Sequence, residues 1–194
     1  RCPVKGHVFI VGHILSFATF IVADRRVFSI MASMVVLLDA GYRSMAERMA
    51  EDRRERCRAL GRVDQSTGKD EEQKWDWEFL GASGELAVAR AFNLCPDFGE
   101  EAGKADFTLP SRKTLDVKTV NYDSRGKNLL VRKSAVHCDV YVLVEHLGFA
   151  RYNLVGWASG ETVRASPVGK VQKGCHFVQA DQLRNCNCKN FFEG

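Results

Sequence analysis

Apolar residues change their spacing several times along the chain, and each spacing predicts a different element. Residues 7–23 form a run without a formal charge, and a second apolar run covers residues 27–38. Three interpretations fit these runs: a membrane anchor or signal peptide, a buried core element, or a leader before a start at Met31 or Met34. We favour the leader, since the residues after Met34 have the elements of a complete fold.

A helical pattern comes after the apolar runs. Met45 and Met49 lie four residues apart, followed by Cys57 and Leu60, and Glu and Arg alternate between these apolar positions at spacings that favour ion pairs along one helix. The pattern predicts a charged amphipathic helix over residues 39–62 that ends near Gly61. Residues 63–74 are polar and rich in turn formers, and predict a linker.

A second helix is expected from Ser83 onward, because Leu86, Ala89 and Phe92 recur at helical spacing. Ser83 is expected to cap this helix, which puts Glu85 in its first turn. The helix dipole stabilises a carboxylate there, so the position explains Glu85 without any metal.

Two short strands in a hairpin are expected next, with turn residues between apolar and β-branched stretches. Alternate residues of a strand share a face, so Asp116 and Lys118 are expected to be neighbours. Asp106 lies across the hairpin from Asp116, where both carboxylates can reach one ion, and Glu85 can approach from the helix packed on the strands. Such carboxylates suit Mg²⁺, which activates a bound water and neutralises charge on a phosphate, and a lysine stabilises the same charge.

The rest of the chain predicts further strands. Residues 128–133 form a third strand, and the nearly continuous apolar run at 139–145 is typical of a central strand covered on both faces. Residues 149–157 are expected to pair with it, and Ser159 to cap a short helix. The fold class is therefore α/β, a small mixed β-sheet flanked by helices, with an N-terminal helical extension. The predicted segments are residues 1–38 (apolar), 39–74 (charged helix and linker), 75–185 (core) and 186–194 (tail).

The order of these acids resembles that of the PD-(D/E)XK nuclease superfamily. The matching residues are Glu85, then Asp106, then the Asp116-Val117-Lys118 triplet on a helix–strand–strand order. The resemblance covers residues 75–157, and a GWAS segment is similar to small, uncharacterised phage-type members. It implies a restriction-endonuclease-like core in which Asp106 and Asp116 hold the metal, Glu85 completes the set and Lys118 is catalytic. The residue before Asp106 is alanine, where the family name has proline.

Composition adds little to this picture. The formal charge of +4 permits nucleic-acid binding without requiring it, and seven scattered cysteines are typical of free thiols rather than of a disulfide framework. Phosphate contacts are expected from basic residues beside the acids, and a polar strand edge explains the same residues equally well. These residues are Lys113, Lys127, Arg132 and Lys133.

The tail carries four potential zinc ligands, Cys175, His176, Cys186 and Cys188, but their spacing departs from the usual zinc pattern. A zinc site is therefore the lesser interpretation. The favoured interpretation is a last strand and a short helix that close the domain.

The sequence thus predicts a Mg²⁺-dependent endonuclease, with Mn²⁺ as a substitute metal, that acts on nucleic acid, foremost DNA. We expect it in the cytoplasm of a bacterial or phage-infected cell. A homodimer would supply two sites for cutting both strands. The alternative is a non-catalytic nucleic-acid-binding or regulatory protein on the same fold.

Overall fold

The computed structural model describes residues 34–61, 70–96, 105–124, 127–169 and 174–186. The chain divides into two units, residues 1–30 and 31–194, and every described residue belongs to the second. The apolar run at 7–23 therefore lies outside the described residues. Among the helices within the described ranges, none has the length and apolar character needed to cross a bilayer.

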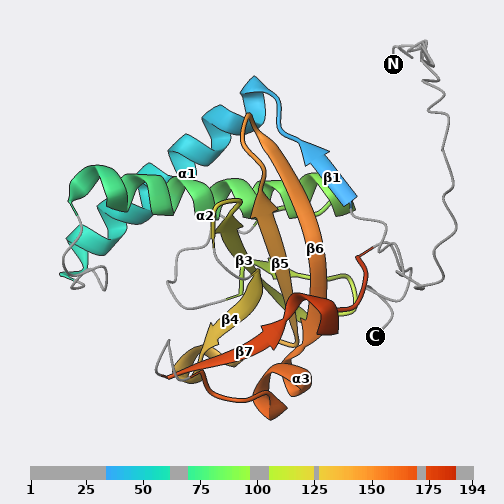
Figure 1. Cartoon of the computed structure of the whole chain (residues 1–194). Helices are drawn as coiled ribbons and strands as arrows, with labels where there is room; N and C mark the ends of the chain where they lie inside the picture. The colour runs from blue at the N-terminus through green and yellow to red at the C-terminus, as the bar shows by residue number, and fades with distance from the viewer. Residues whose placement is uncertain (1–33, 62–69, 97–104, 125–126, 170–173, 187–194) are drawn as a thin grey trace, which may run out of the picture. The chain divides into compact units, whose positions relative to one another are not determined.

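A five-stranded mixed sheet forms the centre of the second unit (Figure 1). Its order is β1-β6-β5-β3-β2, in which β3 and β5 are parallel and all other neighbours antiparallel. The mixed α/β class is therefore confirmed, as are the β2–β3 hairpin and the central position of β5. The strands are β1 Met34–Leu37, β2 Phe107–Thr108, β3 Thr114–Asn121, β5 Val140–His146 and β6 Arg151–Ser159.

The first strand, β1, comes from the end of the second apolar run and pairs with β6. The sheet thus includes residues that the sequence pattern assigns to a separate N-terminal segment. A four-residue edge strand buries little apolar surface of its own, since only Val36 of β1 is fully buried. Its pairing with β6 is a long-range contact that periodicity alone does not reveal.

Two long helices come after the first strand. Helix α1, Ala40–Ala59, is capped by Asp39 and ends where the sequence pattern predicts. Helix α2, Glu71–Phe92, is capped by the side chain of Asp70, which accepts from the Gln73 N–H at 2.8 Å. The predicted cap at Ser83 is therefore wrong, and the last four residues of the predicted linker are helical.

The two faces of the sheet have different covers. Helix α2 packs its buried residues against β3 and β5 on one face. A separate two-stranded sheet lies against the other face, together with helix α3, Gly160–Ala165. This second sheet pairs β4, Asn128–Arg132, with β7, Cys175–Gln179. The predicted third strand is thus confirmed as a strand, with β7 as its partner.

The GWAS segment has a packing role at the end of β6. A Cβ on Gly156 would lie 2.7 Å from the Cβ of Leu183, so only glycine lets the closing segment come this near. The backbone of Trp157 exchanges hydrogen bonds of 2.9 and 2.8 Å with Arg184, and Ser159 caps α3 by accepting from Thr162 N–H. Short 3₁₀ helices at Lys133–Ala135 and Ala180–Gln182 complete the elements.

Candidate functional site

A close contact between α2 and β3 fixes the position of Glu85. A Cβ on Gly84 would lie 1.9 Å from Oγ1 of Thr119, so the helix backbone rests directly on the strand at this point. Gly84 is therefore an interior helix residue selected by packing, rather than part of a helix start. Glu85 accordingly lies in the second half of α2, where only 5% of it is exposed, and the explanation by a first-turn dipole is wrong.

Arg53 of α1 holds the Glu85 carboxylate with two hydrogen bonds. Nη1 donates to Oε1 at 2.8 Å and Nη2 donates to Oε2 at 2.6 Å, a paired geometry that matches guanidinium to carboxylate. Burial lowers the pKa of Arg53, but the bonds and charge of Glu85, with further attraction from Asp106 and Glu78, raise it overall. This pair fixes the buried acid of α2 to the neighbouring helix.

Asp106 and Asp116 meet across the β2–β3 hairpin. Oδ2 of Asp106 accepts the N–H of Val117 at 2.6 Å, which attaches the first acid to the backbone directly after the second. Asp116 is 8% exposed, and Nζ of Lys118 lies 2.5 Å from its Oδ2. Oδ2 of Asp116 is therefore paired with the Lys118 ammonium. The predicted neighbourhood of Asp116 and Lys118 is confirmed.

The pKa of Asp106 shows how the three acids are arranged. Loss of water by burial raises this pKa well above its usual range, and the carboxylates of Glu85 and Asp116 raise it further. The Val117 N–H and the Lys118 ammonium act in the opposite direction but do not compensate. Both other acids are thus close enough to act on Asp106. We call Glu85, Asp106 and Asp116 the acid cluster.

The acid cluster surrounds the edge of the sheet rather than lying on one face. Leu115 and Val117 of β3 pack in the core beneath α2, so the alternate residue Asp116 points toward the opposite face. Glu85 comes from α2, and Asp106 immediately precedes the edge strand β2. The three carboxylates therefore approach from the two sides of β3 and from its edge.

This arrangement bears on metal binding. Carboxylate oxygens are the donors that Mg²⁺ prefers, but Oδ2 of Asp116 is already paired with the Lys118 ammonium. The geometry is incomplete for a closed ion site: within the described ranges, no three acidic, histidine or cysteine side chains form a group that could hold a metal ion. Both oxygens of Glu85, moreover, already accept from Arg53.

The predicted phosphate-binding residues differ in their surroundings. Lys127 pairs with the buried Glu145 of β5 at 2.5 Å, although its side chain remains 45% exposed. Arg132 and Lys133 are exposed at the end of β4, and Lys113 is half-buried in the β2–β3 turn. Lys127 thus also stabilises a buried acid, a role that its position in a polar turn does not reveal.

Arg53 is the site residue that sequence reasoning misses. Its signal is present in the spacing: Arg53 lies four residues after Met49 and eight after Met45, so it falls on the apolar face of α1. Met49 and Ala50 on that face are buried. An arginine on the buried face of an amphipathic helix indicates a buried acid opposite to it.

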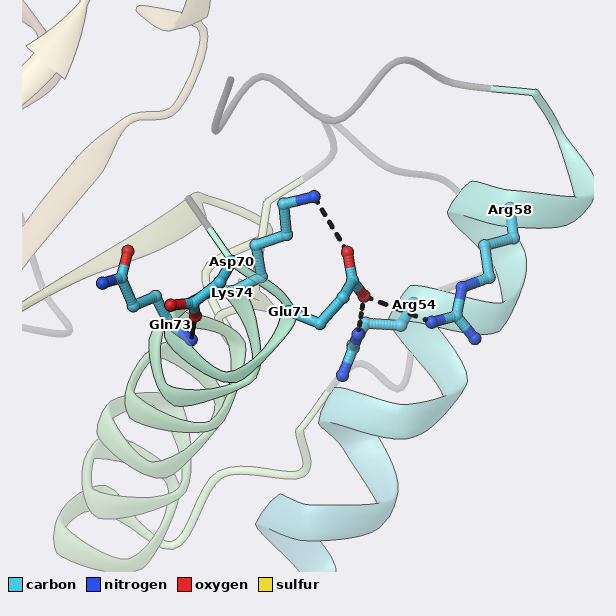
Figure 2. Close-up of polar contacts among 6 residues, drawn as sticks. All are labelled: Arg54, Arg58, Asp70, Glu71, Gln73 and Lys74. Carbon is cyan, nitrogen blue, oxygen red and sulfur yellow. Dashed lines mark hydrogen bonds and ion pairs between the residues drawn. The ribbon is translucent and has the colours of Figure 1, made fainter. Parts of the chain in front are cut away.

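The start of α2 carries a second, very different ionic group (Figure 2). Glu71 binds Arg54 at 2.5 Å, Lys74 at 2.9 Å and Arg58 at 3.5 Å. Its side chain is 66% exposed. We call this set the Glu71 cluster, and it joins the end of α1 to the start of α2.

The cysteine and histidine residues of the tail do not gather in the described part. Nδ1 of His176 lies 2.9 Å from the carbonyl oxygen of Ser166, and Cys186 is buried in the core beneath α2. Cys188 lies outside the described residues. The strand and 3₁₀ helix expected in this region are confirmed as β7 and the turn after it.

A comparison with models of known protein families gave no match to this chain, and a comparison with curated protein sequences gave none either. The chemistry of the site must therefore be argued from its own residues.

Proposed function

We propose that the protein is a metal-dependent nuclease that hydrolyses phosphodiester bonds, foremost those of DNA, on a restriction-endonuclease-like core. The observation that carries the proposal is the raised pKa of Asp106, a half-buried acid on which desolvation and the charges of the buried Glu85 and Asp116 act. Three carboxylates at one sheet edge are costly when buried, unless a cation compensates their charge. Among the described residues Arg53 pairs with Glu85 and Lys118 with Asp116, and a divalent cation would favour the ionised form of Asp106.

Each residue has a role in this proposal. Asp106 and Asp116 would hold Mg²⁺, with Mn²⁺ as a substitute, and Glu85 would complete the set. When bound, the ion would supply an activated water and charge neutralisation at the phosphate. The Lys118 side chain is 36% exposed, so its ammonium can leave Asp116 and stabilise charge on the phosphate oxygens. Lys113, Lys127, Arg132 and Lys133 would contact the nucleic-acid backbone.

The test is cleavage of plasmid and single-stranded DNA, and of RNA, with Mg²⁺ or Mn²⁺. Asp116→Asn keeps the size of the side chain and removes its charge, and we expect a loss of cleavage on the order of 10³-fold with an unchanged circular dichroism spectrum. Asp76→Asn is the control, since Asp76 lies on the exposed part of the same helix as Glu85. If the wild-type protein cuts none of these substrates with either metal, the proposal fails.

A second candidate is a non-catalytic nucleic-acid-binding protein on this fold. One observation favours it: Arg53 bonds both oxygens of Glu85, as expected for an acid neutralised for good by an internal cation. This candidate predicts salt-sensitive nucleic-acid binding that neither metal removal nor Asp116→Asn abolishes. Filter binding in EDTA separates it from the nuclease.

A further inference from the structure

The two edges of the five-stranded sheet differ in their protection against further pairing (Figure 1). Strand β2 forms one edge with two residues, the first of them buried, and Pro110 and the basic Arg112 follow in its turn. Short length, proline and positive charge are features that prevent an edge strand from pairing with another chain. Strand β1 forms the other edge, and residues 27–38 contain neither a charged residue nor a proline. The β1 edge therefore lacks the protection that the β2 edge has.

Strand β1 presents apolar side chains to solvent. Val35 is 51% exposed and Leu37 is 61% exposed, whereas Val36 between them lies in the core beneath α2. Because alternate residues of a strand share a face, Val35 and Leu37 lie together on the face opposite α2. Covering two such side chains is favourable, so this part of the strand suits an apolar partner.

The backbone of β1 also has hydrogen-bonding groups that β6 does not use. The Leu38 N–H donates to the carbonyl oxygen of Ala150 at 2.9 Å, and the antiparallel register of β1 with β6 continues from this pair. Bonded and non-bonded pairs alternate along such a ladder, so Val36 bonds toward β6, while the N–H and C=O groups of Val35 and Leu37 point away from it. Among the described strands, none but β6 pairs with β1. The same two residues thus offer both apolar side chains and backbone donors and acceptors.

We propose that β1 pairs with β1 of a second copy of this chain, antiparallel and about a two-fold axis at Val36, so that two sheets join into one. In this register Val35 of each copy lies opposite Leu37 of the other, and each such pair exchanges two backbone hydrogen bonds. Both outward-pointing residues of the strand are used. The surface is also complementary to itself, as a two-fold interface requires.

The charges beside β1 favour a second copy as the partner. On β6, Arg151 lies opposite Leu37, and Asn153 lies opposite Val35. A row of side chains across the proposed interface therefore runs from Arg151 and Leu37 of one copy to Val35 and Asn153 of the other. These four positions contain a single charge, and the symmetric row contains the other arginine at its opposite end. No like charges therefore face each other across the pair of strands.

The proposed interface is small, since a stable dimer buries more surface than two four-residue strands provide. We therefore expect monomer and dimer to exchange in a way that depends on protein concentration. The inference goes beyond the proposed nuclease and makes no use of the acid cluster. Either proposal can fail while the other stands.

Amide hydrogen exchange, measured by NMR at low and high protein concentration, tests the edge residue by residue. Val36 should be protected at both concentrations, because its N–H faces β6. Val35 and Leu37 should exchange more slowly at the higher concentration, on the order of tenfold. Protection of these two amides in a protein that sedimentation velocity shows to be monomeric would mean that another part of the same chain covers the edge. That result, or fast exchange at both concentrations, would overturn the proposal.

Leu37→Lys tests the same pairing by substitution. It places a charge at the interface twice, once from each copy, and should raise the dissociation constant of the dimer on the order of tenfold or more. Leu60→Lys is the matched control, because Leu60 at the end of α1 is also 61% exposed, and it should leave this constant unchanged. Thermal unfolding checks that each variant is folded, and Val35→Lys is a second variant with the same expectation as Leu37→Lys. A wild-type protein that stays monomeric at every concentration, or a dimer that Leu37→Lys and Leu60→Lys affect equally, would overturn the proposal.

Discussion

Helix α2 carries two ionic groups that are opposite in composition and in burial. At its start, one acid, Glu71, is 66% exposed and meets three basic side chains. In its second half, the side chain of Glu85 is only 7% exposed, and Arg53 bonds both its oxygens. The charge of Glu85 also raises the pKa of Asp106. The first group joins one exposed acid to three cations, whereas the acid cluster holds two buried acids, each paired with one cation, and the half-buried Asp106.

The contrast shows which ionic contacts of this protein need a functional explanation. Exposed ion pairs such as those of Glu71 form easily and are worth little, so joining two helices explains them fully. An excess of buried carboxylates carries a free-energy penalty that folding does not recover, and such sites are where binding and catalysis are found. The acid cluster is therefore the candidate site, and the Glu71 cluster is an ordinary contact between helices.

Loss of Arg53 should have the strongest effect. Arg53→Met leaves the charge of Glu85 buried without this partner, and should lower the free energy of unfolding by about 3 kcal/mol. Arg54→Met removes one of three cations around an exposed acid, and should destabilise much less. Urea denaturation of both variants in EDTA checks this, and equal losses would remove the contrast between the two groups.

Gly84 tests where the buried half of α2 begins. Gly84→Ala places a methyl group against Thr119 and should destabilise the protein by about 2 kcal/mol. Gly81→Ala, less than one turn earlier, meets no atom within 4 Å and should stabilise the helix by up to about 1 kcal/mol. Thermal unfolding of the pair measures both, and a stabilising Gly84→Ala would contradict the close contact of helix and strand.

Asp106 gives a smaller effect of opposite sign. Its pKa is higher in the folded than in the unfolded protein, so the folded state retains the proton more tightly, and stability falls as pH rises above about 4. Asp106→Asn keeps an acceptor for the Val117 N–H and should stabilise the metal-free protein at pH 7. The gain should be absent below pH ~4, where the acid is protonated in both states.

The matching change in the exposed half of α2 is Asp70→Asn. Asparagine caps helices as well as aspartate does, so stability should stay nearly constant at both pH values. Denaturation at pH 4 and pH 7 compares the two substitutions. A pH-independent effect of Asp106→Asn would show that folding does not raise the pKa of Asp106.

Local patterns predict much of this fold. The hairpin before and through β3, the apolar run of β5 and the charged residues of α1 all have short-range signals, and each element is present. The start of α2 escapes such patterns because Gly81 and Gly84 look like a helix boundary, while packing on Thr119 makes glycine favourable inside the helix. Strand alternation predicts that Asp116 and Lys118 are neighbours. The bond from Arg53 to Glu85 joins two separate helices, so only the tertiary structure reveals it.

The nuclease proposal depends on one point: the acid cluster, and not the Glu71 cluster, binds a divalent cation. Substoichiometric Mn²⁺ added to ¹⁵N-labelled protein tests this site by site, because the paramagnetic ion broadens amide signals near its position. We expect the signals of Phe107 and Val117 to broaden first, while those of Gln73 and Lys74 keep their intensity. Uniform broadening, or broadening confined to the start of α2, would contradict binding at the acid cluster.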